Sequence, residues 1–298
     1  MLQGIYRSLI SAPLVSVHIA TFLFGLAGVL GAAVDLGAIE VTFARTLFAS
    51  LTLFIVCRGM NAGVLQYFPP GSLLILLFSG ALLAFHWVAF FASIRASTVA
   101  IGLVTFSTCP VFVALLEPLF FKEKWRIETI AAALLVLLGV LVISGIVSGE
   151  FNYGSGILFG LASGFSFAIL QLLNRRLTHS NGALVTAFIQ NSVATVVLLP
   201  LAFFGFKGVA ANQWIILLIL GVVCTAFAHT LFINALRQVS VSVASLIAAG
   251  LEPVYGVSLA LLILSQLPSA NVIVGGLIIL ITVLGVTLRN HKSKSVQL

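Results

Sequence analysis

Residues 239–265 read VSVSVASLIAAGLEPVYGVSLALLILS, a mostly apolar run with one carboxylate, Glu252, near its centre. A run of this length can cross a hydrocarbon core of roughly 30 Å as a helix. A carboxylate exposed to lipid there costs about 2.5–3.5 kcal/mol, so we expect Glu252 to face protein or a water-filled cavity. Pro253 follows directly and removes one backbone donor, which predicts a helix break at this point.

A small and polar stripe runs along one side of this predicted helix. Its members lie three or four residues apart and therefore share one face. They are Ser242, Ser245, Ala249, Glu252 and Gly256. The other faces are mostly Val, Leu and Ile, which predicts a membrane-spanning helix that packs with its polar side inward.

The whole chain shares this apolar character. Of its 298 residues, 61% are hydrophobic and only 7% are charged. Soluble proteins carry about 25% charged residues, so the composition predicts a polytopic membrane protein embedded in a lipid bilayer. The net charge of +7 is expected in cytoplasmic loops and tails, and no nucleic-acid partner is expected. The three cysteines have no metal-ligand or disulfide spacing, so neither a metal site nor a cofactor is predicted.

Charged residues and Gly, Pro or Asn breaks divide the chain into ten apolar runs. These runs predict an all-α fold of ten transmembrane helices. They cover residues 13–33, 40–57, 71–92, 97–120, 127–147, 154–173, 182–204, 213–234, 240–264 and 270–288. The connections are short, so no soluble domain is expected between the helices.

The positive charges indicate how the helices are oriented. With ten spans both termini lie on one side, and most of the 14 Lys and Arg residues then fall on that side. The other side carries only Arg95 and Lys207, while Arg45 lies within a span. Because cytoplasmic loops are enriched in Lys and Arg, we expect a multi-pass protein of the cytoplasmic (inner) membrane with both termini cytoplasmic.

The two halves of the chain repeat each other. Shifts of 143 and 145 residues align His86 with His229, Ser97 with Ser240, Pro110 with Pro253, and Thr21-Phe22 with Ser166-Phe167. We therefore predict two five-helix repeats, residues 1–149 and 150–298. Because five is odd, the second repeat enters the membrane in the opposite orientation, an inverted arrangement typical of secondary transporters.

Several short motifs carry a resemblance to a known family. They are Phe43-Ala44-Arg45, Pro110 with the later Lys122-Glu123-Lys124, and Glu252-Pro253. The chain resembles the EamA-type ten-helix transporters of the drug/metabolite transporter superfamily over essentially its whole length. The resemblance implies a substrate cavity between the halves, alternating access and export from the cytoplasm. It also implies that Trp87 and Tyr255 lie at the depth of this cavity.

Glu252 is the strongest functional candidate, because no other carboxylate lies near the middle of a predicted span. In one interpretation it binds a cationic or amino group, or takes up a proton during the transport cycle. In the other interpretation it is structural, a protonated or hydrogen-bonded acid that ties neighbouring helices together. The sequence leaves both interpretations open.

His86, His229 and Arg45 each have two interpretations as well. The two histidines are related by the repeat and lie on polar stripes, so both could face one cavity and contact substrate or relay protons. Alternatively, each imidazole bonds a nearby backbone carbonyl. Arg45 either holds a substrate carboxylate, or it snorkels outward or pairs with Asp35 or Glu40.

The predicted span 97–120 carries two hydroxyls beside a predicted helix break at Pro110. In one interpretation Thr105 and Thr108 supply these hydroxyls to a substrate. In the other, they bond carbonyls that the proline leaves without a partner.

These features predict a secondary transporter that exports small organic metabolites, such as amino acids, amines or drug-like compounds. It is expected to act as a monomer or homodimer, with possible coupling to protons. We do not expect an enzyme, because the chain lacks the paired acids or partnered His that an intramembrane enzyme needs. Rings of like charge, which a channel would need, are not visible either. An intramembrane enzyme and a channel-like permease remain the alternatives.

Overall fold

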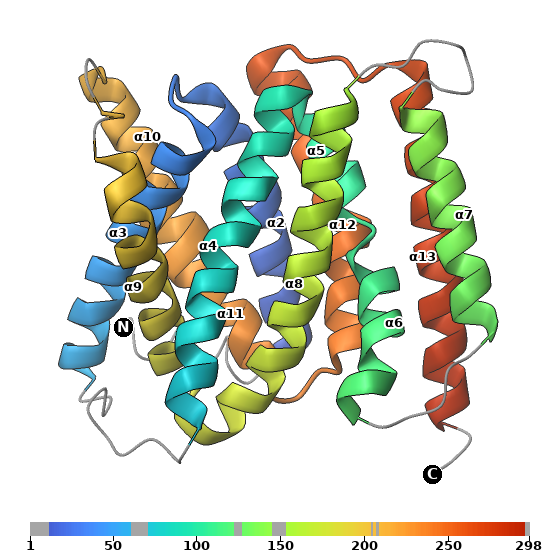
Figure 1. Cartoon of the computed structure of the whole chain (residues 1–298), viewed down its shortest axis with the longest axis horizontal. Helices are drawn as coiled ribbons and strands as arrows, with labels where there is room; N and C mark the ends of the chain where they lie inside the picture. The colour runs from blue at the N-terminus through green and yellow to red at the C-terminus, as the bar shows by residue number, and fades with distance from the viewer. Residues whose placement is uncertain are drawn as a thin grey trace.

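The computed structural model describes residues 12–60, 71–121, 127–144, 153–203, 205–206 and 209–295. Every regular element in these ranges is a helix, and the helices stand side by side in one bundle (Figure 1). The Lys122-Glu123-Lys124 motif and Lys207 lie outside the described residues. The predicted all-α class is confirmed for the part of the chain that the structure describes.

The helices follow one another along the chain with short connections. Those of the first half are α2 (Pro13–Ala33), α3 (Ala38–Gly59), α4 (Ser72–Ala96), α5 (Val99–Phe106), α6 (Cys109–Phe121) and α7 (Ile127–Ile143). Those of the second half are α8 (Gly154–Asn181), α9 (Ala183–Ala202), α10 (Ala211–Gly221), the π-helix η2 (Val222–Phe227), α11 (Ala228–Ala235), α12 (Val241–Leu264) and α13 (Ala270–Ser295). The pair α5 and α6 forms one span, and so do α10, η2 and α11 together.

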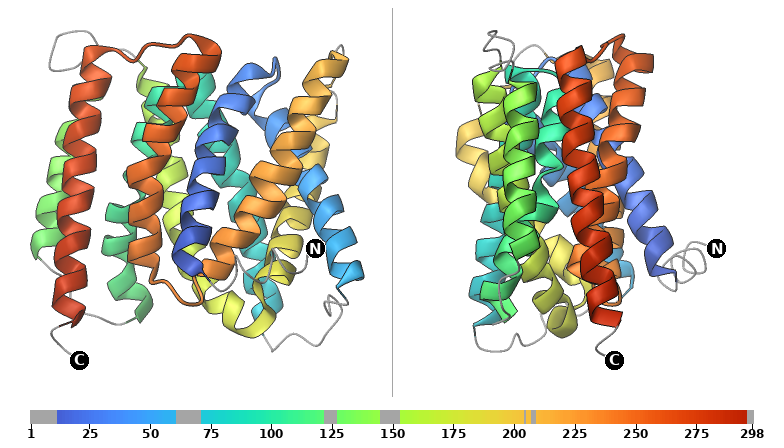
Figure 2. Two further views of the ribbon diagram at one scale, coloured as in Figure 1. Left: turned by 180° about the vertical axis from the view of Figure 1, so that it is seen from behind. Right: turned by 90° about the vertical axis from the view of Figure 1, so that its right-hand side faces the viewer.

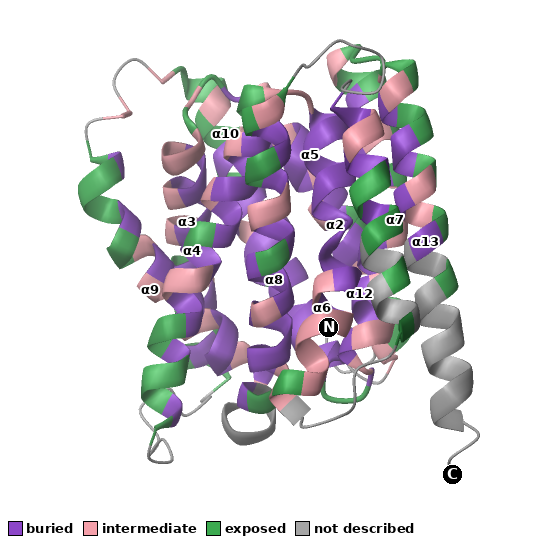
Figure 3. Cartoon of the chain, turned by 45° about the vertical axis from the view of Figure 1, so that its right-hand side comes forward, coloured by how far each residue is buried: buried purple, intermediate pink, exposed green. Residues whose placement is uncertain are grey.

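The bundle has the surface of a membrane protein. In the described ranges, eight segments are long and apolar enough to cross a membrane, and shorter apolar stretches lie at Leu134–Ile143 and Ala270–Thr282. Figure 3 shows buried residues inside the bundle and exposed ones on its outer faces. Large hydrophobic side chains such as Leu74 and Leu262, 73% and 78% exposed, lie on those outer faces. A patch of this kind is rare on a soluble protein, so the prediction of a multi-pass membrane protein is confirmed.

The core forms where helices of one half pack against helices of the other. The most extensive contacts are those of α4 with α8, α2 with α12, α7 with α13 and α3 with α9. Figures 1 and 2 place α7 and α13 together at one edge, outside the main core. The same views show that α2 begins and α13 ends at the same end of the bundle.

Polar side chains satisfy several helix ends. Thr98 and Ser240 each accept a bond from the backbone N–H three residues later, which caps α5 and α12. Arg95, in the last turn of α4, donates to the carbonyls of Gly31 and Val34 where α2 ends. These bonds fill acceptors that a helix C-terminus leaves without a partner.

The two prolines predicted to break helices behave differently. The backbone turns at Ser107 and Thr108, so α5 ends there and α6 starts at Cys109 with Pro110 as its second residue. Proline suits this position, because backbone N–H groups in the first turn of a helix have no acceptor within the helix, and proline has no N–H. At Pro253 the prediction is wrong, because α12 continues through the proline as one helix. One lost N–H bond does not end a helix whose other bonds and packing persist.

Candidate functional site

A cavity lies inside the bundle between helices of both halves. It is lined by Phe24, Ala27, Arg45, His86, Trp87, Phe90, Phe106, Phe167, His229 and Glu252. The cavity volume is about 20 Å³, and one water molecule needs about 10–15 Å³ of such space. The free space in the cavity is therefore enough for about one water molecule.

Arg45 on α3 points into this cavity. Its side chain is 2% exposed, and its guanidinium lies 4.0 Å from the centroid of the Trp87 ring. Nε donates to Thr225 Oγ1 (2.9 Å), and Nη2 donates to the Cys224 carbonyl (3.4 Å). The cation–π contact and the two hydrogen bonds stabilise the inward position. The interpretation in which Arg45 snorkels outward or pairs with surface carboxylates is therefore wrong.

The groups that hold Arg45 come from the π-helix η2. Thr225 Oγ1 also donates to the carbonyl of Leu220, five residues earlier (2.7 Å), which is the residue spacing of hydrogen bonds in a π-helix. Bulges of this kind are frequent at functional sites. Sequence reasoning placed His229 on a polar stripe of this span and did not predict the bulge.

Glu252, near the middle of α12, places its carboxylate at the same cavity. The residue is 3% exposed, and its Oε2 has no hydrogen-bond partner among the described residues. Although Arg45 lines the same cavity, no ion pair within 4.0 Å joins these two described side chains. A buried carboxylate without a partner is costly, so this position favours either a proton or a positively charged group.

The two histidines line the cavity and also have hydrogen-bond partners. His86 Nδ1 lies 3.0 Å from both the carbonyl oxygen and Oγ of Ser163, and the ring stacks on Phe167 with centroids 4.8 Å apart. His229 Nε2 lies 3.2 Å from Gln190 Oε1. The structural and the functional interpretation of each histidine are therefore compatible.

Gln190 on α9 is a buried polar residue that sequence reasoning missed. Its Nε2 donates to Ser79 Oγ (2.8 Å) and to Asn174 Oδ1 (2.6 Å), while its Oε1 faces His229. A signal for it was present, because the 145-residue shift that aligns the two halves places Gln190 on Arg45. The residue connects the cavity to polar side chains of α4 and α8.

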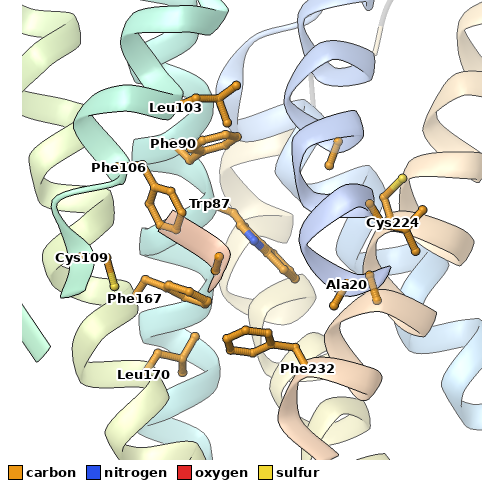
Figure 4. Close-up of a cluster of buried hydrophobic side chains, with 14 of the residues drawn as sticks. Ala20, Trp87, Phe90, Leu103, Phe106, Cys109, Phe167, Leu170, Cys224 and Phe232 are labelled. Carbon is orange, nitrogen blue, oxygen red and sulfur yellow. The ribbon is translucent and has the colours of Figure 1, made fainter. Parts of the chain in front are cut away.

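Aromatic side chains form most of the remaining wall. Figure 4 shows the rings of Phe90, Phe106, Phe167 and Phe232 gathered around Trp87. Neighbouring rings in this set have centroids 5.4 Å (Phe106 and Phe167) and 5.8 Å (Phe90 and Phe106) apart. Such walls keep water out, and charges interact more strongly where water is excluded.

Three residues predicted to bind substrate lie outside the cavity lining. Tyr255 packs edge-on against Phe22 with ring centroids 5.5 Å apart, and Phe22 is 42% exposed. Thr105 Oγ1 donates to the Ile101 carbonyl (2.6 Å), and Thr108 Oγ1 donates to the Thr105 carbonyl (2.8 Å). Both hydroxyls therefore bond carbonyls of their own segment. In this conformation none of the three lines the cavity, and their contact with a substrate stays a prediction.

The chemistry of the cavity is that of a binding site for a polar or charged solute. It offers one guanidinium, one carboxylate and two imidazoles within aromatic walls, a combination typical of a small-molecule site. Within the described ranges, no three His, Cys, Asp or Glu side chains are arranged to hold a metal ion.

Comparison with known structures supports the fold. One solved crystal structure shares 19% sequence identity and superposes with a TM-score of 0.69, over 95% of this chain and 98% of that chain. At this identity the likeness shows a common fold.

Comparison with known sequences identifies the family. An uncharacterized transporter of Bacillus subtilis, YxxF, is 27% identical over 80% of this chain and 77% of its own length. The pseudopaline exporter CntI of Pseudomonas aeruginosa is 27% identical over 88% of this chain and 91% of its own. The sequence profile of the EamA-like transporter family matches residues 12–145 and again residues 154–288. Since these two matches take in most of both halves, the chain belongs to the EamA-like transporter family.

Proposed function

We propose that this protein is a secondary transporter that exports small organic metabolites, such as amino acids, amines or drug-like compounds, by alternating access. The observation that carries the proposal is the buried cavity that brings together Arg45, His86, His229 and Glu252. Ionisable groups this deep in a membrane bundle are costly and typical of substrate or ion pathways. The chain has no nucleotide-binding motif, so an ion gradient is the proposed energy source.

Two inverted five-helix repeats, residues 1–149 and 150–298, are the proposed architecture. In this repeat, α2 corresponds to α8, α4 corresponds to the span of α10, η2 and α11, and the span of α5 and α6 corresponds to α12. The packing supports the repeat, because corresponding pairs of helices are in contact. The contact of α4 with α8 matches that of α11 with α2, and the contact of α2 with α12 matches that of α8 with α5 and α6. The family profile also matches once in each half. Counting α7 and α13 as spans gives the ten helices. Rocking one half against the other would open the central cavity to each side of the membrane in turn.

Glu252 is the proposed proton-coupling residue. It lines the cavity, and its Oε2 has no bond to another described group, so a proton or a substrate cation can occupy that position in alternation. His86 and His229 line the same cavity and are the next candidates, because an imidazole changes its charge near neutral pH.

Counterflow in proteoliposomes tests the transport proposal. Purified protein is reconstituted, the liposomes are loaded with unlabelled amino acids, amines or drug-like cations, and uptake of each labelled solute is measured with and without a pH gradient. We expect saturable uptake that the unlabelled solute inside accelerates, because a carrier must return its site across the membrane. Protein-free liposomes and the lipid-facing variant Leu262→Ala serve as controls, and the variant should transport normally.

Two outcomes of this experiment contradict the proposal. A channel-like permease would give a flux that neither saturates nor responds to solute on the other side. An intramembrane enzyme would change the solute chemically, which mass spectrometry of the recovered solute would detect.

A further inference from the structure

The two charged side chains of the cavity break the relation between the halves. The 145-residue shift pairs Arg45 with Gln190, and the 143-residue shift pairs Glu252 with Cys109. Each pair therefore consists of one charged and one neutral residue. The positive charge belongs to the first half of the chain, and the negative charge belongs to the second.

The neutral partners are engaged in hydrogen bonds within the protein. Gln190 bonds Ser79 and Asn174 and faces His229. Cys109 Sγ accepts a bond from the side-chain Nε2 of Gln171 (3.2 Å). Neither neutral residue is among the cavity-lining residues. The cavity thus has charged side chains at Arg45 and Glu252, while the two counterpart side chains bond other protein groups and do not line it.

The charged residues, in contrast, keep free hydrogen-bonding capacity. Glu252 Oε2 has no partner among the described residues. Arg45 uses Nε and Nη2 for Thr225 and Cys224, which leaves Nη1 without a hydrogen bond to a described residue. Both side chains are at least nine-tenths buried, at 3% and 2% exposure, and no ion pair within 4.0 Å neutralises them against each other. A guanidinium and a carboxylate that line one cavity and do not pair directly can be bridged by a ligand that carries both opposite charges.

We propose that the cavity binds a zwitterion, a small molecule whose carboxylate is held by Arg45 and whose ammonium group is held by Glu252. This inference rests on the transport function proposed above and names its substrate class. Trp87 stacks on the guanidinium of Arg45 and fixes its direction, while the surrounding rings exclude water from both charged contacts. Because this cavity has room for about one water molecule, the proposal requires a wider conformation of the same site when the zwitterion binds.

Binding of matched ligands tests this proposal. The probes are leucine, leucinamide, which lacks the carboxylate, and 4-methylpentanoate, which lacks the ammonium group, with a second set of the same three forms built on phenylalanine. Affinity is measured by calorimetry on the purified protein in nanodiscs. We expect each zwitterion to bind about ten- to a hundredfold more tightly than either of its truncated forms, the range typical of a lost charged hydrogen bond.

Two variants assign each ligand group to its residue. In Arg45→Gln, which copies the repeat counterpart, leucine and leucinamide should bind equally, since no guanidinium remains for the carboxylate. In Glu252→Gln, leucine and 4-methylpentanoate should bind equally. Arg45→Lys and Glu252→Asp keep the charges and replace the neutral variants where these fail to fold. Each should weaken binding of the zwitterion, because the shorter or differently shaped group holds the ligand less well. Glu117→Gln is the matched control, because this carboxylate accepts a bond from Ser242 away from the cavity lining.

The result that overturns the proposal is equal binding of a zwitterion and one of its truncated forms by the unaltered protein, or no binding of either zwitterion. If counterflow then still carries amines or drug-like cations, the transporter function stands and only the zwitterion assignment fails. If no solute shows counterflow, the transport proposal itself fails.

Discussion

At the scale of single residues, the proposed function depends most on Glu252. It is 3% exposed at the centre of a lipid-spanning helix, and one carboxylate oxygen has no partner in the described structure. The charged or titratable groups that line the cavity with it are Arg45, His86 and His229. A glutamine would fit the same space without the cost of a buried charge, and for this reason we propose that Glu252 has a role that needs ionisation.

Replacing Glu252 by glutamine separates the two interpretations of this residue. Glu252→Gln should insert and fold almost normally, because shape and most hydrogen-bonding capacity are kept. It should abolish the effect of a pH gradient on transport, because the amide takes up no proton. Counterflow with and without a gradient, together with a thermal melt in detergent, measures both properties.

The alanine variant supplies the control for this experiment. A purely structural Glu252 predicts that the glutamine variant keeps gradient-driven transport and that Glu252→Ala lowers the melting temperature. Full gradient-driven transport in the glutamine variant would remove Glu252 from the coupling mechanism. His86 and His229 would then be the residues to replace next.

The residues of the site could be predicted from the sequence only where their chemistry conflicts with the membrane. Glu252, Arg45 and the two histidines stand out because a charge or imidazole within an apolar run is costly and rare. Gln190 is neutral, and its importance comes from hydrogen bonds to three other helices. Such bonds depend on how the helices pack together, and the residue pattern within one predicted span gives no information about that packing.

At the scale of the elements, the π-helix η2 fixes the direction of Arg45. The hydroxyl of Thr225 accepts a bond from Nε and anchors itself on the Leu220 carbonyl. Thr225→Val keeps the side-chain shape and removes this bond. We expect the affinity for leucine to fall about tenfold, with no change for leucinamide, because only the carboxylate contact depends on Arg45.

Thr230→Val is the matched control for the η2 experiment. The Thr230 hydroxyl bonds the Ala226 carbonyl of its own span (2.6 Å), and the residue is not among those that line the cavity. Calorimetry should show unchanged affinity for leucine in this variant. An equal loss for leucine and leucinamide in Thr225→Val would mean that the hydroxyl supports the span as a whole.

The contact of α2 with α12 is a second element on which the site depends. A Cβ added at Gly25 would lie 3.0 Å from the Glu252 carbonyl oxygen and 3.0 Å from the Gly256 nitrogen. Both are backbone atoms, so the helices themselves would have to separate. Gly25→Ala should therefore destabilise the protein by about 1–3 kcal/mol, the usual cost of overpacking, and lower the melting temperature.

Gly250 on α12 is the control for this packing argument. A Cβ there meets nothing within 4 Å, and alanine is favoured over glycine within a helix by up to about 1 kcal/mol. Gly250→Ala should leave the melting temperature unchanged or raise it. If Gly25→Ala behaves in the same way, then α2 and α12 are not held as closely as the structure shows.

The membrane-spanning helices could be predicted from the sequence where the length of an apolar run determines the helix. The long runs appear as helices close to their predicted bounds, since a hydrocarbon core selects length and apolar character together. The continuous helix at Pro253 and the bulge of η2 were not predictable in this way. Both depend on whether neighbouring helices and side chains satisfy the altered backbone, and this information lies outside the segment itself.

At the scale of the whole molecule, the orientation proposed for the bundle rests on charge asymmetry. α2 begins and α13 ends at the same end of the bundle, and that end carries most of the Lys and Arg residues if the ten-span count holds. Since positive residues are retained on the cytoplasmic side, we propose that this end is cytoplasmic. The opposite end, with Arg95 as a described basic residue, would then face outward.

Cysteine labelling in intact cells tests this orientation with little background. The native cysteines, Cys57, Cys109 and Cys224, are all buried at 2% exposure or less, so the unaltered protein should react poorly with a membrane-impermeant maleimide. Ser148→Cys, between the two halves, should label from outside. Ser293→Cys, near the end of α13, should label only after the cells are permeabilised. Labelling of Ser293→Cys in intact cells would reverse the orientation and, with it, the side from which the cavity is proposed to load substrate for export.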